Sequence, residues 1–142
     1  MRDRIQRRLN GEQGVAALEF AIVSMVFMLV LFGILTYGFI FGLDQSLNHA
    51  AEEGARSAIS TTSDSAAVTK AHDTAIQRLN WLGSRIQSSD VVAAVAPCAN
   101  DTSVKCVTVT ITYPWNTRPI VPKFVGLPTP SQMQAVAIVE LT

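Results

Sequence analysis

Glu19 is the ionisable residue whose position is hardest to reconcile with simple exposure to water. It immediately precedes an uncharged run, Phe20–Leu43, and follows four apolar residues, Val15–Leu18. A carboxylate at the centre of a membrane helix costs about 2.5–3.5 kcal/mol, and less near the interface. Two interpretations are open: either Glu19 lies at the level of the lipid headgroups, or it meets a positive charge, namely an amine, within the membrane.

Cys98 and Cys106 are the only cysteines, with seven residues between them that include good turn formers. In an oxidising compartment they can close a short loop, which contributes on the order of 2–3 kcal/mol in the chain-entropy estimate. A metal site would need further ligands, and the only histidines are His49 and His72. The sequence therefore favours a disulfide between Cys98 and Cys106, with two free thiols as the alternative.

The remaining polar residues do not match a catalytic arrangement. The chain lacks a Gly-rich phosphate loop, a histidine–carboxylate zinc spacing and a G-x-S-x-G motif. Glu52 and Glu53 are adjacent, so on a helix they point apart and are interpreted as a solvated face. Both histidines are interpreted as surface residues, and Trp81 and Trp115 as core residues. We therefore predict no enzyme activity, no cofactor and no metal site, and the zero net charge gives no basis for nucleic acid as a partner.

The uncharged run is long enough to cross a lipid bilayer. As a helix its 24 residues extend for ~36 Å, and the hydrocarbon core is ~30 Å thick. A cleavable secretory signal has an apolar region of only ~7–15 residues, and a domain of this size could hardly enclose the whole run. We therefore predict a single transmembrane helix at residues 15–43, in contact with membrane lipid.

The charges on either side of the run predict its orientation. The first fourteen residues carry four arginines against two acids, whereas the other side begins with Asp44, Glu52 and Glu53. Cytoplasmic flanks carry an excess of arginine and lysine, so the N-terminus is expected in the cytoplasm. Residues 44–142 are then expected to form an extracytoplasmic domain.

Sequence periodicity predicts the elements that position these residues. The helical pattern continues beyond the membrane run, so one helix is expected from about residue 15 to about residue 60, with Gly54 at a close contact. A polar stretch then caps a second helix at 64–88, which folds back against the first. The end of the chain changes period, and it predicts about three antiparallel strands, separated by the cysteine loop and by a proline-rich connection: 91–96, 104–113 and 132–141. The predicted fold class is α+β, with a long N-terminal transmembrane helix extending into a small domain.

The segment Gly14-Val15-Ala16-Ala17-Leu18-Glu19-Phe20, between a basic leader and the apolar helix, resembles a type IV prepilin processing site. The resemblance implies that a membrane-bound prepilin peptidase cuts between Gly14 and Val15 on the cytoplasmic side. Residues 1–14 would be the leader, and Glu19 would be the fifth residue of the mature chain. The resemblance assigns Glu19 to pairing with an N-terminal amine when subunits pack together.

Further residues narrow the resemblance to TadE-like proteins, which are pseudopilins of the tight-adherence (Tad) type IVb pilus machinery. They are Phe20 directly after the glutamate, Phe32-Gly33 within the helix, and Glu53-Gly54-Ala55-Arg56 beyond it. The resemblance implies a minor pilin or pseudopilin that acts in assembly of the pilus, or at its tip or base, with other pilins as partners. It would be held in the bacterial inner membrane with its domain in the periplasm. The alternative is a permanently anchored single-pass periplasmic binding or assembly module that is not processed.

Overall fold

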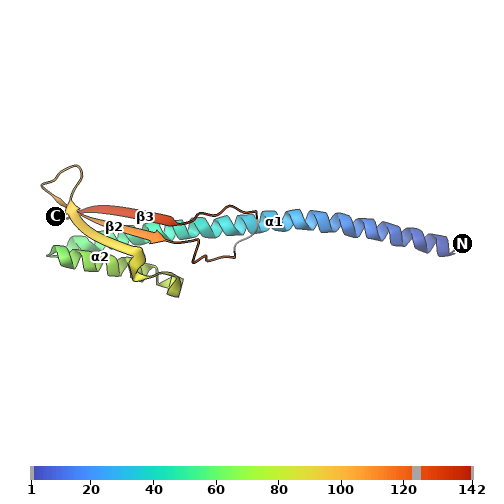
Figure 1. Ribbon diagram of the computed structural model, residues 1–142, viewed down its shortest axis with the longest axis horizontal. Coiled ribbons are helices and arrows are strands. Elements are labelled where there is room, and N and C mark those ends of the chain that lie inside the picture. Colours follow the sequence, from blue (N-terminus) through green and yellow to red (C-terminus); the bar gives the residue numbers. More distant parts are fainter. Residues whose placement is uncertain (1, 123–125, 142) are drawn as a thin grey trace. The chain divides into compact units, whose positions relative to one another are not determined.

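The computed structural model describes residues 2–122 and 126–141, with side chains from Gly14 onward. Its helices and strands follow one another as α1 (Arg2–Ser57), α2 (Asp64–Arg78), β1 (Val91–Pro97), β2 (Lys105–Tyr113) and β3 (Met133–Leu141) (Figure 1). Three short 3-10 turns lie between them: η1 (Ala58–Ser60), η2 (Asn80–Arg85) and η3 (Ser88–Asp90). This is the predicted α+β layout, and contacts divide it into two units, Met1–Gly38 and Phe39–Thr142.

The first unit consists of the N-terminal part of α1. Every apolar side chain from Val15 to Leu35 is exposed, and this stretch lies in a helix long and apolar enough to be a candidate membrane span. The helix begins at Arg2 and not near residue 15 as predicted, because the N-terminal segment contains good helix formers and no proline. The predicted leader, residues 1–14, therefore falls on α1, and the side chains of its first thirteen residues lie outside the described part of the chain.

In the second unit, α1 packs against α2 through small side chains. The apolar residues at helical spacing in the predicted second helix are buried: Ala67, Ala71 and Ala75 of α2, and Leu79 and Leu82 just after it. In α1, Leu47, Ala50, Ala51 and Ala55 are fully buried, as is Ala58 of η1, whereas Ile59 of η1 is 41% exposed. Alanine loses no rotamer freedom on burial, so the alanines of this interface are buried without a side-chain entropy cost.

The second helix begins as predicted but ends earlier. Ser63 caps α2, since its side chain accepts a hydrogen bond from the Ala66 N–H at 3.3 Å. The predicted helix over 64–88 was too long: α2 ends at Arg78, and the chain continues as η2. From Leu79 the hydrogen bonds are of the 3-10 type, since the Leu79 N–H donates to the Ile76 carbonyl at 3.0 Å and the Leu82 N–H to the Leu79 carbonyl at 2.9 Å. Further on, the positive φ of Gly83, 57°, interrupts the helical path, so it cannot continue to residue 88.

The three strands form an antiparallel sheet in the order β1-β2-β3, so each strand pairs with its neighbour in sequence. Register places Val91 opposite Ile111, and Ile111 opposite Ala135, on the face that is buried. The other face carries the exposed side chains of Val92, Val136 and Ile138. The predicted hairpin and the alternation of β2 are thus confirmed.

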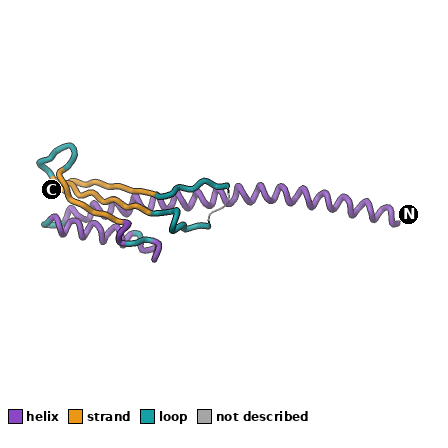
Figure 2. The backbone as a smooth tube through the Cα atoms, in the orientation of Figure 1, coloured by secondary structure: helices purple, strands orange, loops and turns teal. Residues whose placement is uncertain are grey.

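The core is completed by two aromatic residues at the end of β2. Tyr113 and Trp115 are fully buried, so the core prediction for Trp115 is correct. The prediction was wrong for Trp81, which is 59% exposed and lies on η2, beyond the end of α2, where Leu82 and not Trp81 is buried. The described parts of the connection from β2 to β3 contain no helix or strand, as its prolines predicted (Figure 2).

Candidate functional site: the assembly segment and the domain that follows it

The segment predicted to be processed lies within α1 and is fully accessible. Gly14 is exposed, and a side chain added there would meet no atom within 4 Å. Val15 is 68% exposed and Phe20 is 74% exposed. Each residue from Gly14 to Phe20 is exposed in the described part of the chain.

Glu19 is exposed on this helix and makes no hydrogen bond or ion pair within residues 14–122 and 126–141. It is the only acid in an apolar stretch that runs from Val15 to Leu43. Glu19 follows Val15 by four residues, and residues at that spacing lie on the same helix face, one turn apart. The arrangement therefore presents a lone carboxylate, one turn beyond the predicted cut, on a helix surface that is otherwise uncharged.

The segment Glu53-Gly54-Ala55-Arg56 holds α1 and α2 together. A Cβ atom at Gly54 would lie 2.7 Å from the backbone oxygen of Ala71 and 3.0 Å from the Cβ atom of Ala75. These distances leave no room for a side chain, so the predicted close contact at Gly54 is confirmed. Glu53 pairs with Arg78 of α2 at 3.5 Å, but both side chains are largely exposed, and such a pair contributes about 1 kcal/mol at most.

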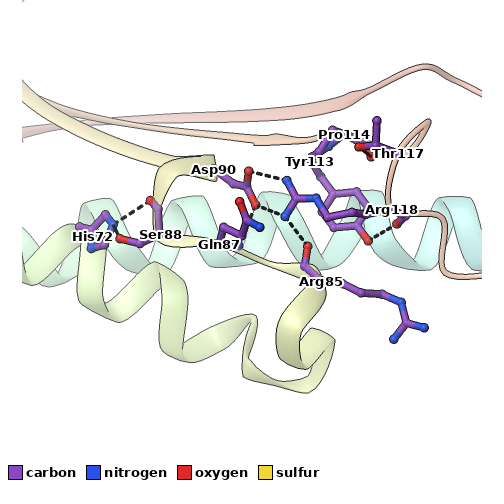
Figure 3. Close-up of polar contacts among 9 residues, drawn as sticks. All are labelled: His72, Arg85, Gln87, Ser88, Asp90, Tyr113, Pro114, Thr117 and Arg118. Atoms are coloured by element: carbon purple, nitrogen blue, oxygen red, sulfur yellow. Dashed lines mark hydrogen bonds and ion pairs between the residues drawn. The ribbon is translucent and has the colours of Figure 1, made fainter.

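A second polar cluster lies where β1 begins and β2 ends, and it consists of Asp90, Tyr113 and Arg118 (Figure 3). The Arg118 guanidinium donates to Asp90 through Nη2–Oδ1 at 2.7 Å and Nη1–Oδ2 at 2.8 Å, and Nη1 also donates to the Arg85 carbonyl at 2.7 Å. The Tyr113 hydroxyl donates to the Arg118 carbonyl at 2.6 Å. The cluster therefore joins the segment that enters β1 to the segment that leaves β2, because Asp90 precedes β1 and Arg118 follows β2.

The protonation of this cluster follows from its geometry. The hydrogen bonds to Asp90 raise the pKa of the Arg118 guanidinium, so it is charged at any physiological pH. Burial raises the pKa of the Tyr113 hydroxyl, although the nearby positive charge of Arg118 opposes that shift. Both shifts keep these two groups protonated near neutral pH, so the ion pair and the Tyr113 hydrogen bond are present together there.

The cysteine loop joins β1 and β2. Cys98 and Cys106 form a disulfide, and the Cys98 N–H donates to the Val104 carbonyl at 2.9 Å, which continues the hairpin ladder into the loop. Within the loop, the Ser103 hydroxyl donates to Asp101 at 2.6 Å and its backbone N–H donates at 2.9 Å. These hydrogen bonds lower the pKa of the Asp101 carboxyl. The predicted disulfide is therefore present and closes a hairpin turn.

The histidines predicted to be surface residues have ordinary polar partners. The His49 ring lies 3.0 Å from the Gln45 amide, and the His72 ring lies 3.0 Å from the Ser88 hydroxyl. In the described part of the chain, no group of three or more His, Cys, Asp or Glu residues could hold a metal ion.

Comparison with protein families matches residues 14–56 to the TadE-like protein family. The match begins at Gly14 and ends at Arg56, so it spans the junction, Glu19, the apolar run and the Gly54 contact. This segment of the chain is TadE-like. No curated protein and no solved structure matches the chain significantly. The family match suggests a protein associated with the Tad pilus machinery and a structural rather than a catalytic role.

Sequence reasoning missed two features of this chain. One is the ion pair between Asp90 and Arg118, which are separated by the whole β1–β2 hairpin and share no local pattern. The other is the hydrogen bond from the Trp81 indole to the Ser46 hydroxyl at 3.1 Å, which joins η2 to α1. A tryptophan beyond the end of an apolar stripe is the only signal that could have indicated the second.

Proposed function

We propose that this TadE-like protein is a minor pilin or pseudopilin of the Tad type IVb pilus, and that prepilin peptidase removes residues 1–14. The observation that carries the proposal is Glu19, an exposed carboxylate with no partner among the described residues 14–122 and 126–141, in an otherwise uncharged stretch of α1 and one turn after Val15. The family match that begins at residue 14 supports the assignment of Gly14 as the last residue of the leader.

Hydrolysis of the bond between Gly14 and Val15 would free the Val15 amine. An α-amino group has a pKa near 7.7–8.0, so most of it is positively charged at neutral pH. Two such helices offset by four residues, a stagger of about 6 Å, would place the amine of one beside Glu19 of the other. Pairing would neutralise the amine and the carboxylate in a low-dielectric environment. Only one offset between the two helices would bring these two groups together. Glu19 would thereby select the register of assembly.

The membrane arrangement follows from the same proposal. The leader arginines would hold the N-terminus in the cytoplasm of a bacterial cell, and the domain that begins after Leu43 would lie in the periplasm. Prepilin peptidase, membrane lipid and other pilins are the proposed partners. In this arrangement the domain serves pilus assembly, or is displayed at the tip or base of a pilus used for adherence.

The decisive experiment is mass spectrometry of the N-terminal peptide of the protein from its native membrane. We expect a chain that starts at Val15. Gly14→Arg should accumulate uncut, whereas Gly11→Arg, the same substitution three residues upstream, should be trimmed normally. A wild-type chain that starts at Met1 or Arg2, or normal trimming of Gly14→Arg, would instead support the permanently anchored, unprocessed module.

The role of Glu19 is tested separately from cleavage. Glu19→Gln should still be cut after Gly14 but should lose co-purification with the other pilus subunits, since its neutral amide cannot compensate an amine. Glu52→Gln is the matched control, because Glu52 is exposed beyond the apolar run. Undiminished co-purification of Glu19→Gln would contradict the pairing.

A further inference from the structure

The second unit carries a polar groove where α1 faces the C-terminal end of α2. The groove has a volume of about 550 Å³, within the range of about 300–1,000 Å³ that is usual for small-molecule sites. Two small residues of α1, Gly42 and Ala50, leave room in it. Its polar lining comes from the side chains of Gln45, Ser46, His49 and Glu53 of α1 and Arg78 of α2. The groove is therefore open, and its lining is mainly polar.

Trp81 stands at the edge of this groove. Its indole N–H donates to the Ser46 hydroxyl at 3.1 Å, and the residue is 59% exposed. Because the N–H is used within the protein, the part of Trp81 that remains for a ligand is mainly the apolar ring. An exposed aromatic ring beside a polar groove suits a ligand that has an apolar face and a polar rim.

The polar groups of the groove include both a free donor and a free acceptor. The Gln45 amide nitrogen lies 3.0 Å from the His49 Nε2 atom. An amide nitrogen can only donate, so Nε2 accepts and the proton of the neutral ring is on Nδ1. Both side chains are exposed, and neither the Gln45 oxygen nor the His49 Nδ1–H has a partner within residues 14–122 and 126–141. The two groups are thus available to a ligand that both donates and accepts hydrogen bonds.

The charges that line the groove are balanced. Glu53 and Arg78 are the acid and the base of its lining, and they pair with each other at 3.5 Å. The pair gives the groove no preference for an anion or a cation. The remaining lone pairs of the carboxylate and the remaining N–H groups of the guanidinium can still bond to hydroxyl groups. The lining therefore fits a polar ligand without charge.

We propose that this groove binds an uncharged saccharide, with one sugar ring stacked on Trp81 and its hydroxyl groups bonded to Gln45 and His49. A pyranose ring carries C–H groups on its faces and hydroxyl groups around its rim, and each hydroxyl both donates and accepts. These are the properties that the ring of Trp81 and the polar lining require. The site lies wholly within the second unit, so it depends neither on processing at Gly14 nor on Glu19.

The test measures the fluorescence of Trp81 in the full-length protein. Phosphatidylcholine nanodiscs hold the protein, because a detergent with a sugar headgroup would compete for the groove. The chain has two tryptophans, and Trp115 is fully buried, so Trp81→Phe supplies the signal of Trp115 alone. The probes are cellotetraose, maltotetraose, mannotetraose and chitotetraose. We expect at least one of them to shift the Trp81 emission to shorter wavelength in a saturable manner and to protect it from iodide.

Two results would overturn the proposal. One is the absence of saturable binding by all of these saccharides. The other is tighter, salt-sensitive binding of a glucuronic acid tetramer, which would indicate an anion site at Arg78.

Matched variants locate the site, with binding measured by calorimetry. Trp81→Ala should weaken binding by about tenfold or more, whereas Trp81→Phe keeps an aromatic ring and should weaken it less. Gln45→Ala should weaken binding by about fivefold, since it removes one hydrogen bond to the ligand. Gln77→Ala, the same change at an exposed residue of α2 that does not line the groove, should leave binding unchanged. Equal effects of the two glutamine variants, or undiminished binding by Trp81→Ala, would contradict the assignment.

Discussion

Asp90 and Arg118 form a two-point ion pair that joins the residue before β1 to the connection after β2. Their side chains are 9% and 19% exposed, so the pair is partly buried, unlike the exposed pair of Glu53 and Arg78. Geometry of this kind fixes both the distance and the orientation of the two groups. The sheet is thus fastened at the end of β1 and β2 opposite the disulfide.

Asp90→Ala should lower the free energy of unfolding by about 3 kcal/mol, because it leaves the Arg118 guanidinium without its counter-charge. Chemical unfolding of the full-length protein in detergent, followed by circular dichroism, measures the change. Glu53→Ala is the matched control and should change stability by about 1 kcal/mol or less. Equal losses in the two variants would show that burial does not distinguish the pairs.

Gly54→Ala should destabilise the domain by about 1–3 kcal/mol, although alanine is the better helix former by about 1 kcal/mol. The added methyl group would lie 2.7 Å from the Ala71 carbonyl oxygen, so α1 and α2 must separate. Gly42→Ala makes the same change where no atom lies within 4 Å, and it should be neutral or stabilising. Thermal unfolding of both variants measures the difference, and a stable Gly54→Ala protein would refute the close contact.

Tyr113 predicts a loss of stability at alkaline pH. Its pKa is raised in the folded state, so the unfolded chain releases this proton first, near pH 10, and ionisation favours unfolding. The stabilisation is complete below about pH 10 and is lost as pH rises through the higher folded pKa. Tyr113→Phe should therefore be less stable than wild type at neutral pH but should lose less stability above pH 10. Parallel pH profiles of the two proteins would contradict this assignment.

Removal of the disulfide should cost about 2.5 kcal/mol in the chain-entropy estimate for a loop of this length. The double variant Cys98→Ala/Cys106→Ala tests this against wild type in urea. Wild type treated with a reductant should unfold at the same urea concentration as the double variant, and the double variant should not respond to the reductant. A response of the double variant would place the effect of the reductant elsewhere.

Helices and strands of this chain were predictable from the sequence where a local periodicity of apolar residues determines the element. The alanine stripe of α2 and the alternation of β2 are local periodicities, and burial follows them residue by residue. The end of α2 was not predictable, because buried apolar residues continue at helical spacing to Leu82, whereas the α-helix already gives way to 3-10 hydrogen bonding at Leu79 and the positive φ of Gly83 then interrupts the path. Trp81 was misassigned for the same reason, since it follows the point at which the helical period stops.

In the candidate site, too, single residues were predictable from the sequence, whereas their distant partners were not. Glu19 is conspicuous in the sequence because it is a charge in an apolar run, and Gly54 because glycine disfavours a helix interior. The partners of Gly54, Asp90 and Trp81 lie between about 17 and 35 residues away along the chain, at positions that only the tertiary structure brings together.

The strand order of the sheet bears on how the domain is built during synthesis. Each element packs on one that was made earlier: α2 on α1, β1 on α2 and then β2 and β3 each on the preceding strand. No strand must wait for a later one to be inserted between it and its neighbour, so the pairings stay short in sequence and form early. The domain can therefore fold from its helical end onward while the remainder of the chain is still emerging, and β3 is the last element to be added.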